Sequence, residues 1–379
     1  MTGNPPQIDL RSEFPIKEQY AFFNHAGVAP IPWSTQMAIS EFARDAAEEG
    51  PANYPAWIHS MATARGFAGE LLNCSADDIC FVKNTTHGIL IAANSINWRE
   101  GDNVVGLAHE FPANVHPWKN LAARGVEFRM VSEEPDFTFS VDRIVSHLDE
   151  RTRVLAVSWV EYSTGVRNDI EQLGKICRER GILFCVDAIQ GLGVLKMDLQ
   201  QLQADFVVAD GHKWLLGPEG CGILYVRREI IPQLNESMCG WCGLLNPQEY
   251  DNYDQQLKPT ARRFEEGSHN IMSIIAMGTS IRLLLDVGNQ QVIARVRALT
   301  EEVIAGAESK GYEVITPREF EKRAGIVSIR KAGQDVAEVA ARLLKEHKIQ
   351  IAARRGFIRV SPHFYNDEGE VERLVAALP

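Results

Sequence analysis

Short apolar runs alternate with helical stretches along the first two thirds of this 379-residue chain. After Asp77, these runs are separated by segments with the 3.6-residue apolar period of amphipathic helices. The runs lie at residues 79–82, 103–108, 128–131, 154–157, 183–186, 206–209 and 222–226. Strands that alternate with helices form βαβ units, so the pattern predicts an α/β fold with a mostly parallel, seven-stranded sheet flanked by helices. The run 222–226 closely follows the run before it and is expected to be antiparallel.

The pattern changes after about Arg262, where long helical segments replace the alternation. Two amphipathic helices, 34–49 and 56–72, are predicted before the first strand. After Arg262, helices are predicted at 271–285, 292–310 and 367–377, with isolated strands at 326–330 and 357–360. We therefore predict a large domain over residues 22–261 and a smaller α+β C-terminal domain over residues 262–379, completed by residues 1–21.

Composition narrows the possible partners. The formal charge of −11 disfavours nucleic acid and anionic membranes as partners. No apolar run approaches the roughly 20 residues of a membrane span, and residues 1–6 lack a basic and then apolar signal sequence. The seven cysteines, an odd number scattered through predicted helices and strands, fit reduced thiols better than disulfides. These features predict a cytoplasmic protein with no nucleic-acid and no membrane partner.

Lys213 and Asp187 are the residues with the clearest chemistry, and each follows or ends an apolar run. In a parallel sheet both would lie along one edge, where cofactor sites are built. An amine that forms a Schiff base, near an acid that pairs with a pyridinium nitrogen, is what pyridoxal phosphate chemistry requires. Most lysines are solvated surface groups. Here the apolar flanks 207–209 and 214–216 would desolvate the Lys213 amine and lower its pKa.

Other positions have both a functional and a purely structural interpretation. Asp187 could cap a following helix, although the Gln190 amide nearby, which could donate to a ring oxygen, favours a cofactor. Thr85 and Thr86, at the start of a predicted helix, could hold a phosphate or simply cap the helix. Arg359, inside the apolar strand 357–360, could bind a substrate carboxylate or form an internal salt bridge.

Cys239 and Cys242 have the CxxC spacing of redox and zinc sites. No second CxxC and no histidine pair completes a metal site, and the strand-then-helix context of thioredoxins is absent from the sequence pattern. We therefore expect a loop beside the active site, without a metal and without redox activity.

Taken in order, these motifs resemble the class V aminotransferase family, within the fold type I group of pyridoxal phosphate enzymes. Relatives in that family include cysteine desulfurases, kynureninases and isopenicillin N epimerase-like proteins. The resemblance covers nearly the whole chain and is carried by residues 24–30, 84–86, 187–190, 211–213, 264–268 and 359–366. It implies a fold type I enzyme with pyridoxal 5'-phosphate (PLP) as cofactor and an amino acid or keto acid as substrate.

The resemblance implies a role for each residue of the cofactor motif. Lys213 would hold the cofactor as a Schiff base, Asp187 would pair with the pyridine nitrogen, and Gln190 would contact the ring hydroxyl. Thr85 and Thr86 would hold the phosphate.

Further roles follow from the same resemblance. His212 and Asp210 would lie near the phosphate, and Arg359 would bind the substrate α-carboxylate. Ser268 would reach the phosphate of a neighbouring subunit, which implies a homodimer with shared active sites. Additional candidates for the substrate pocket, each of which could as easily pack at a subunit boundary, are His25, Asn53, Tyr54, Trp241 and Arg355.

The sequence departs from the family pattern at several positions. Phe111 stands where desulfurases carry a histidine stacked on the ring; a phenylalanine can stack there but cannot transfer a proton. Residues 351–359 contain no cysteine and leave no room for the mobile loop of desulfurases, so persulfide-forming chemistry is not expected. Asp210 replaces the small hydroxyl residue of many relatives and Tyr162 replaces their asparagine, which alters the phosphate and ring contacts.

The first steps that these residues support are common to several reactions. Lys213 would remove the α-proton of a substrate held by Arg359, after which transamination, loss of a β or γ substituent, or epimerisation could follow. We expect an aminotransferase, as the broad family implies. The alternatives are a C–S or C–C lyase or an epimerase, and a non-catalytic binding protein of the same fold.

Overall fold

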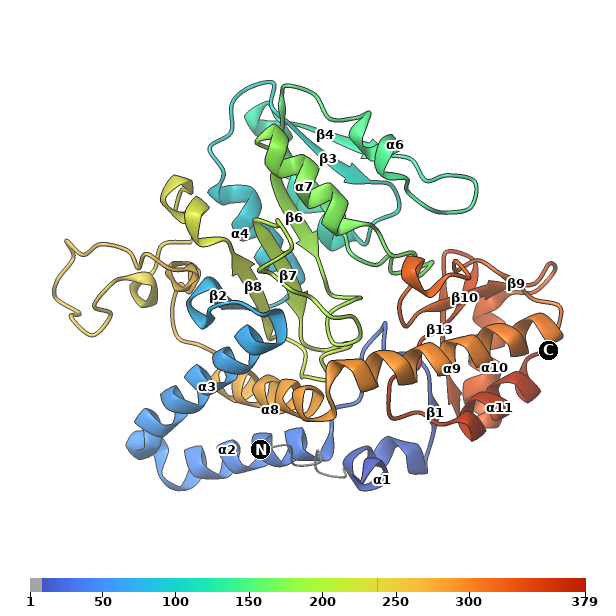
Figure 1. The fold of residues 1–379 in the computed structure, drawn as a ribbon. Helices are drawn as coiled ribbons and strands as arrows, with labels where there is room; N and C mark the ends of the chain where they lie inside the picture. Colours follow the sequence, from blue (N-terminus) through green and yellow to red (C-terminus); the bar gives the residue numbers. More distant parts are fainter. Residues whose placement is uncertain (1–8, 237) are drawn as a thin grey trace.

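A seven-stranded sheet forms the centre of the structure, a computed structural model that describes residues 9–236 and 238–379 (Figure 1). Its strands are β2 (Ile79–Val82), β3 (Asn103–Leu107), β4 (Glu127–Val131), β5 (Thr152–Ser158), β6 (Leu183–Asp187), β7 (Phe206–Asp210) and β8 (Gly222–Val226). Their order is β2-β8-β7-β6-β5-β3-β4. β8 is antiparallel to both neighbours, and the other pairs are parallel. The predicted α/β fold with its mostly parallel sheet is therefore confirmed.

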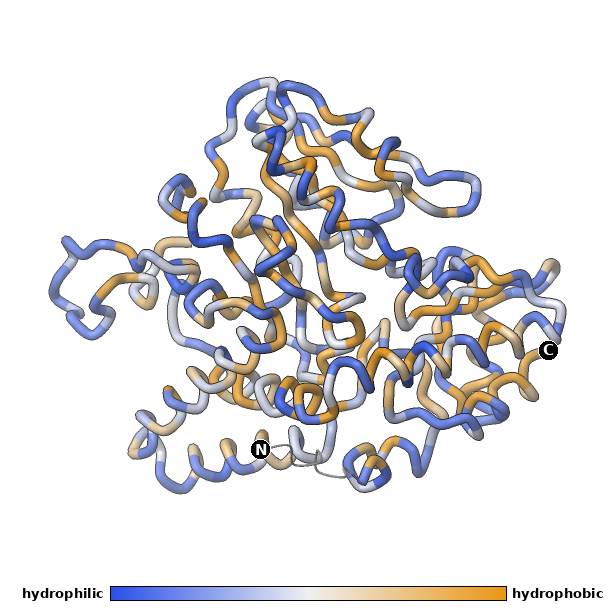
Figure 2. Tube along the Cα trace, viewed as in Figure 1, coloured by the Kyte–Doolittle hydropathy of each residue, from blue (hydrophilic) through white to orange (hydrophobic). Residues whose placement is uncertain are grey.

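Alternate side chains of the strands enter two apolar cores, one on each face of the sheet. Val207 and Ala209 of β7 pack in the core that contains α3 (Tyr54–Leu72), α7 (Ile170–Arg180) and α8 (Ile271–Val287). Phe206 and Val208 pack on the other face with α4 (Thr85–Ser95) and α5 (His116–Lys119). Figure 2 shows the central strands as largely apolar, which is typical of strands buried on both faces.

The smaller domain is an antiparallel sheet covered by helices. The sheet has the order β12-β13-β10-β9 and consists of β9 (Glu313–Val314), β10 (Val327–Arg330), β12 (Ala352–Arg354) and β13 (Phe357–Val360). Its helices are α9 (Asn289–Ser309), α10 (Val336–His347) and α11 (Glu368–Ala377). The predicted strands and helices of this region are present, whereas α10, β9 and β12 were not predicted. β9 and β12 are too short to show a period of two. The apolar residues of α10, in contrast, recur with the helical period, so this helix could have been predicted from the sequence.

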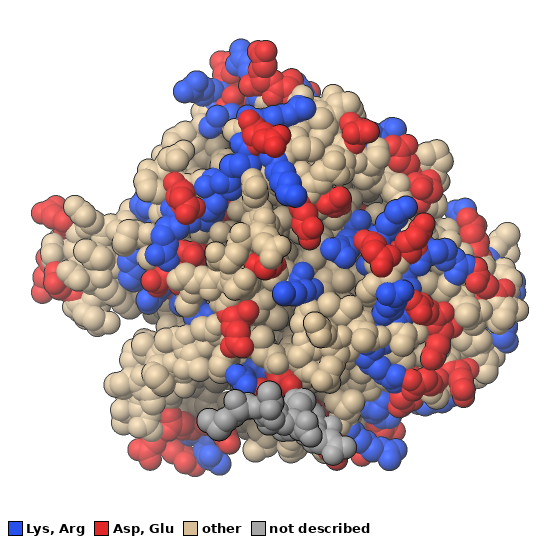
Figure 3. Space-filling model, viewed as in Figure 1, with Lys and Arg blue, Asp and Glu red and all other residues tan. Residues whose placement is uncertain are grey.

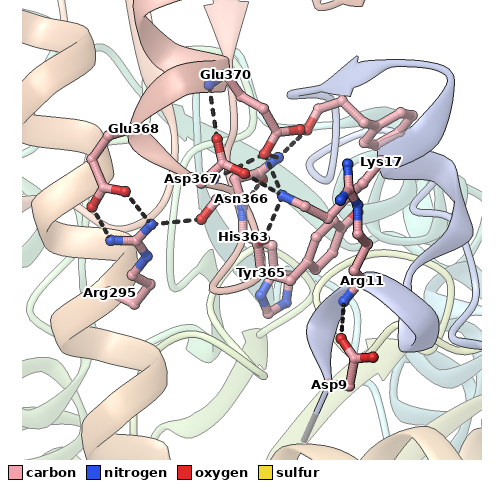
Figure 4. Close-up of polar contacts among 11 residues, drawn as sticks. Asp9, Arg11, Lys17, Arg295, His363, Tyr365, Asn366, Asp367, Glu368 and Glu370 are labelled. Carbon is pink, nitrogen blue, oxygen red and sulfur yellow. Dashed lines mark hydrogen bonds and ion pairs between the residues drawn. The ribbon is translucent and has the colours of Figure 1, made fainter.

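The N-terminal segment, which includes α1 (Leu10–Glu13), packs on the smaller domain. β1 (Ala21–Phe22) pairs in parallel with β11 (Ile349–Gln350). The Lys17 ammonium donates to the Tyr365 carbonyl at 2.9 Å and pairs with Asp367 at 2.9 Å and Glu370 at 2.7 Å (Figure 4). The Phe14 ring stacks on Tyr365 with centroids 3.8 Å apart. These contacts hold the chain that follows β13 against the N-terminal segment.

The packing of α8 and α9 shows where the two cores separate. α8 lies against α2 (Trp33–Glu48) and α3, and its Met277 belongs to the core of the large domain. In α9, Val296 still belongs to that core, whereas Leu299 belongs to the core of the smaller domain. We therefore propose a domain boundary within α9 rather than at residue 262.

Surface charges of both signs are interspersed over most of the face seen in Figure 3, although the region over α3 carries few. Exposed apolar side chains of α2 and α3 include Trp33, Met37, Tyr54 and Ile58.

Among the described residues, no single helix is long and apolar enough to cross a membrane. The α8–α9 pair passes on combined length and composition, but it is bent by 83°. The short helix α6 (Val141–Val145) lies between β4 and β5 in the chain.

A buried ion pair joins α3 to the chain that precedes α8. The Arg65 guanidinium donates to the two carboxylate oxygens of Glu265 at 2.6 and 3.2 Å and to the Ile79 carbonyl at 2.9 Å. The Phe81 N–H donates to the same carboxylate at 2.9 Å. The pair therefore connects the helix α3, strand β2 and the segment after the 3₁₀ helix Ala261–Phe264.

Replacing Arg65 by methionine should lower the free energy of unfolding by about 3–5 kcal/mol, because the buried Glu265 carboxylate would lose the cation that contacts both of its oxygens. Arg262, at 4.0 Å and partly exposed, is a poor substitute. Urea unfolding followed by circular dichroism measures this difference. Arg297→Met is the matched control, since Arg297 pairs with Glu301 at the surface and should contribute less than about 1 kcal/mol. Equal effects of the two substitutions would contradict the assignment.

Candidate active site

A cavity of about 310 Å³ lies at the carboxyl ends of β5, β6 and β7, beside the N-terminus of α4. Loops meet at this edge of a parallel sheet and form binding sites there. The predicted residues that line the cavity are Thr85, Thr86, Phe111, Asp187, Gln190, Asp210, His212, Lys213 and Arg359. The rest of the wall consists of Ala26, Gly27, Val28, Asn84, Ala113, Tyr162, Ile189 and Arg354.

Lys213 is buried in the cavity wall, with 7% of its surface exposed. It follows β7, and its neighbours Trp214 and Leu215 are buried in the core. Burial lowers the pKa of the Lys213 amine to about 8, although the nearby Asp187 carboxylate raises it. The Nζ lies 5.3 Å from the centroid of the Phe111 ring. A substantial fraction of this amine is neutral near pH 8 and can attack an aldehyde.

Asp187 ends β6 and is 2% exposed. The Ile189 N–H donates to its Oδ1 at 3.0 Å. Burial raises the pKa of this carboxyl group to about 6, and the Ile189 hydrogen bond and the Lys213 charge oppose that rise. No helix lies between β6 and β7, a stretch that the structure describes in full, so Asp187 does not cap a helix. No cation of the described residues pairs with Asp187 within 4 Å, which suits it to a cationic ring nitrogen from outside the chain.

Gln190 is oriented by two hydrogen bonds. Its Nε2 donates to the Ala26 carbonyl at 3.1 Å, and its Oε1 accepts from the Trp214 indole at 2.8 Å. The amide has two N–H donors, so one donor remains beyond the Ala26 contact for a group in the cavity.

The N-terminus of α4 provides the donors at one end of the cavity. The Asn84 side chain caps the helix by accepting from the His87 N–H at 2.9 Å. Helix geometry leaves the N–H groups of Thr85 and Thr86 without intrahelical partners. The Thr85 hydroxyl accepts from the Asp210 N–H at 3.2 Å, which joins the helix to the end of β7. Backbone N–H groups and hydroxyls at a helix N-terminus form an anion site.

Asp210 and His212 lie side by side at this end. The Nδ1 of His212 is 3.1 Å from Oδ2 of Asp210, close enough for an ion pair when His212 is protonated, although its N–H is not directed along a hydrogen bond. The Oδ1 of Asp210 is buried and has no hydrogen-bond partner among the described residues.

Arg359 of β13 is 1% exposed and points into the cavity. Its Nη1 donates to the Tyr162 carbonyl at 2.8 Å and its Nη2 to Asn24 Oδ1 at 3.2 Å, whereas the buried Nε has no partner in the described part of the chain. Burial lowers the pKa of Arg359 to about 9, and the nearby Arg354 charge lowers it as well. No carboxylate of the described residues pairs with Arg359, so the internal salt bridge is excluded there, and a carboxylate from a ligand would satisfy it.

Several candidates lie outside the cavity wall. The His25 ring is fully buried behind it, where its nitrogens contact the Ser361 carbonyl at 2.7 Å and the Tyr365 hydroxyl at 2.6 Å. The predicted contact of His25 with a substrate is therefore corrected: its ring supports the cavity wall from behind. Arg355 pairs with Glu133 at 3.0 Å. The other candidates that do not line the cavity are Asn53, Tyr54, Trp241 and Ser268.

Ser268 is exposed, outside the cavity of its own chain. Its predicted contact with a neighbouring subunit stays a prediction. The CxxC pair is also outside the wall: Cys239 is exposed, Cys242 is half-buried, and both lie in the segment between β8 and α8.

Two buried carboxyl groups behind the cavity were not predicted. Glu110 accepts from the Ser158 N–H at 2.6 Å, from the Ser158 hydroxyl and from the Asn114 amide at 3.1 Å. Burial raises the pKa of Glu110 to about 8, despite the Ser158 hydrogen bonds. Burial and then the neighbouring Glu110 raise the pKa of Glu161 well above its ordinary value. Burial therefore makes both groups harder to ionise than an exposed glutamate.

Comparisons with known proteins agree with this geometry. A probable cysteine desulfurase of Methanothermobacter thermautotrophicus is 30% identical over 389 residues, covering 97% of this chain and 96% of the relative. A cysteine desulfurase of Cronobacter sakazakii is 30% identical and covers 97% and 96%. An uncharacterised aminotransferase of Bacillus subtilis is 25% identical and covers 96% and 95%. The family model for aminotransferase class-V matches residues 23–374.

The chain belongs to the aminotransferase class-V family. Its fold agrees with that of the apo cysteine desulfurase from Thermococcus onnurineus NA1, with a TM-score of 0.88, 24% identity and coverage of 99% of this chain and 97% of that chain. A C-DES variant with glycine covalently linked to its PLP cofactor has a TM-score of 0.89 at 22% identity and covers 97% and 98%. These are fold type I enzymes, and PLP is the cofactor of the family.

The cavity wall fits PLP. It combines a buried amine, a buried carboxylate without an ion-pair partner, and free N–H groups at a helix N-terminus. The exposed ring of Phe111, which contacts Tyr162 edge to face at 5.4 Å, offers an apolar surface to a cofactor ring.

In the apoprotein the Lys213 amine should titrate with a midpoint near pH 8. Asp187→Asn should move the midpoint to lower pH, because it removes the negative charge that stabilises the ammonium form. Reductive ¹³C-methylation followed by NMR titration measures this pKa, and Lys213→Arg identifies the resonance by its loss. A midpoint above pH 10, unchanged in Asp187→Asn, would show that the amine is solvated.

Proposed function

We propose that this chain is a PLP-dependent aminotransferase that acts on an α-amino acid. The observation that carries the proposal is the composition of the cavity wall: among the described residues, Lys213 is its one amine and no cysteine lines it. Transamination requires one group that takes a proton from the substrate and returns it to the cofactor. An amine with a pKa of about 8 can do both near neutral pH.

The proposed roles follow from the positions of the side chains. Asp187 pairs with the pyridine nitrogen, and the helix donors at Thr85 and Thr86 bind the phosphate. When bound, PLP supplies an electron sink for the electron pair left at the substrate α-carbon. Lys213 first anchors the cofactor and then carries the proton, and Arg359 holds the substrate carboxylate so that the α-hydrogen faces the lysine.

Other wall residues shape the reaction without moving a proton. Phe111 covers one face of the cofactor ring, and its phenyl ring leaves proton transfer to Lys213. Gln190 donates its remaining N–H to the ring oxygen. His212, beside Asp210, lies at the phosphate end.

A second candidate is cleavage of a carbon–sulfur bond, which is favoured by the names of the relatives as cysteine desulfurases. A persulfide on this chain would need a cysteine at the cavity. Neither Cys239 nor Cys242 lines the cavity, and the other five cysteines are buried or half-buried. The short turn between β12 and β13 also carries no cysteine. A lyase reaction here would therefore release sulfur directly from the substrate.

The two candidates differ in stoichiometry. For the aminotransferase, holoenzyme mixed with a panel of amino acids should form one equivalent of keto acid per site, lose the visible absorption of the lysine-bound cofactor and release no ammonia. Lys213→Ala should form no keto acid, because the proton carrier is gone, and Lys258→Ala is a control outside the cavity wall. Repeated formation of keto acid with ammonia or sulfide, in the absence of an amino acceptor, would contradict transamination and support the lyase.

We also infer a homodimer. The exposed apolar side chains of α2 and α3 and the exposed position of Ser268 support it. Equilibrium sedimentation should give about twice the 42.3 kDa chain mass, and Trp33→Glu with Tyr54→Glu should shift the equilibrium toward the monomer, because two charges would be buried in the interface. A wild-type protein that sediments as a monomer at micromolar concentration would overturn this inference.

A further inference from the structure

The hairpin of β12 and β13 carries arginines at both ends of one face. Ala352 lies opposite Arg359, and Arg354 lies opposite Phe357. Residues directly opposite in an antiparallel pair share a face, and so do residues two apart along a strand. Arg354 and Arg359 are therefore diagonal neighbours on the same face, and both line the cavity. Ala352 and Phe357 are the other two residues of this face, and neither carries a charge.

The next arginine, Arg355, lies in the turn of the hairpin and contacts residues outside the cavity wall. Arg355 and Gly356 form the turn, with positive φ angles of 50° and 78°. Arg355 donates to Glu133 at 3.0 Å and to the Ser163 hydroxyl at 3.3 Å, so its charge is already neutralised.

Arg354 has no such partner. Its Nη1 donates to the Ala353 carbonyl at 2.8 Å, and no carboxylate of the described residues lies within ion-pair distance of it. Its side chain is exposed where it reaches the cavity. A flexible guanidinium without an acid, at the wall of a binding site, is suited to an anionic group of a ligand.

The two arginine charges also act on each other. Besides burial, the Arg354 charge is a cause of the lowered pKa of Arg359, and it lowers the pKa of Lys213. One carboxylate on Arg359 would leave the second charge of this face unpaired. A ligand with two anionic groups would pair with both.

We propose that the substrate is an α-amino acid with an acidic side chain, whose α-carboxylate binds Arg359 and whose side-chain carboxylate binds Arg354. This inference rests on the proposed function, because it places the substrate amine at Lys213. Asparagine and glutamine are the neutral counterparts that the site discriminates against, since their amides would leave Arg354 without an anion.

The test compares matched pairs of amino acids, glutamate with glutamine and aspartate with asparagine, in the single-turnover reaction of the holoenzyme. Wild type should favour the better acidic substrate over its amide by about tenfold to a hundredfold, the range expected for a charge-assisted hydrogen bond. Arg354→Gln should abolish this preference, because the rate with the acid should fall toward the rate with the amide. Arg354→Lys should restore part of the preference, and Arg355→Gln, on the paired arginine, should retain it.

Two results would overturn the inference. In wild type, equal rates with the acid and the amide would show that no side-chain anion is recognised. Equal losses for both substrates in Arg354→Gln would place Arg354 on the α-carboxylate together with Arg359.

A binding measurement separates this inference from the proposed function. Calorimetric titration of the PLP-loaded protein with glutarate and with its monoamide requires no turnover. Tighter binding of glutarate, lost in Arg354→Gln, supports a site for two anions even if no amino acid is converted, in which case only the aminotransferase proposal fails. Equal affinity for glutarate and its monoamide in wild type overturns the inference even if transamination is observed.

Discussion

The burial of Asp187 and Lys213 at one edge of the sheet is the constraint on which the site depends. The parallel register places Ser158 beside Asp187 and Asp187 beside Val208, so the carboxylate and the lysine that follows β7 share the same desolvated surroundings. Burial opposes both charged forms, which raises the pKa of Asp187 to about 6 and lowers that of Lys213 to about 8. A cofactor with a cationic ring nitrogen and an aldehyde satisfies both groups.

The substrate side of the cavity depends on the smaller domain. Arg359 is held by the Tyr162 carbonyl after β5 and by Asn24 after β1, so its position joins three distant parts of the chain. The N-terminal segment fixes the chain after β13 through Lys17 (Figure 4). Because the cofactor groups belong to the large domain and the arginines to the smaller one, a shift between the domains would affect substrate binding more than cofactor binding.

The strands and the long helices could be predicted from the sequence, because apolar periodicity is a local feature. The residues of the cofactor motif line one cavity, and their individual roles stay predictions. That Arg355 is paired with an acid while Arg354 is not could not be predicted, because this difference depends on the hairpin turn and on Glu133, which is distant in sequence. Nor could the burial of His25 behind the wall, which results from its contacts with Ser361 and Tyr365. The boundary that we propose within α9 is equally absent from the sequence pattern, because it depends on tertiary contacts of α8 and α9 that no linker marks.

The central claim is that Lys213 is the residue that bears the cofactor. Borohydride reduction of the PLP-loaded protein fixes the cofactor on its lysine, and peptide mapping by mass spectrometry then locates it. The account predicts a single modification, on the peptide that contains Lys213, at close to one per chain. Labelling of another lysine such as Lys83 or Lys258, or no stable label at all, would contradict it.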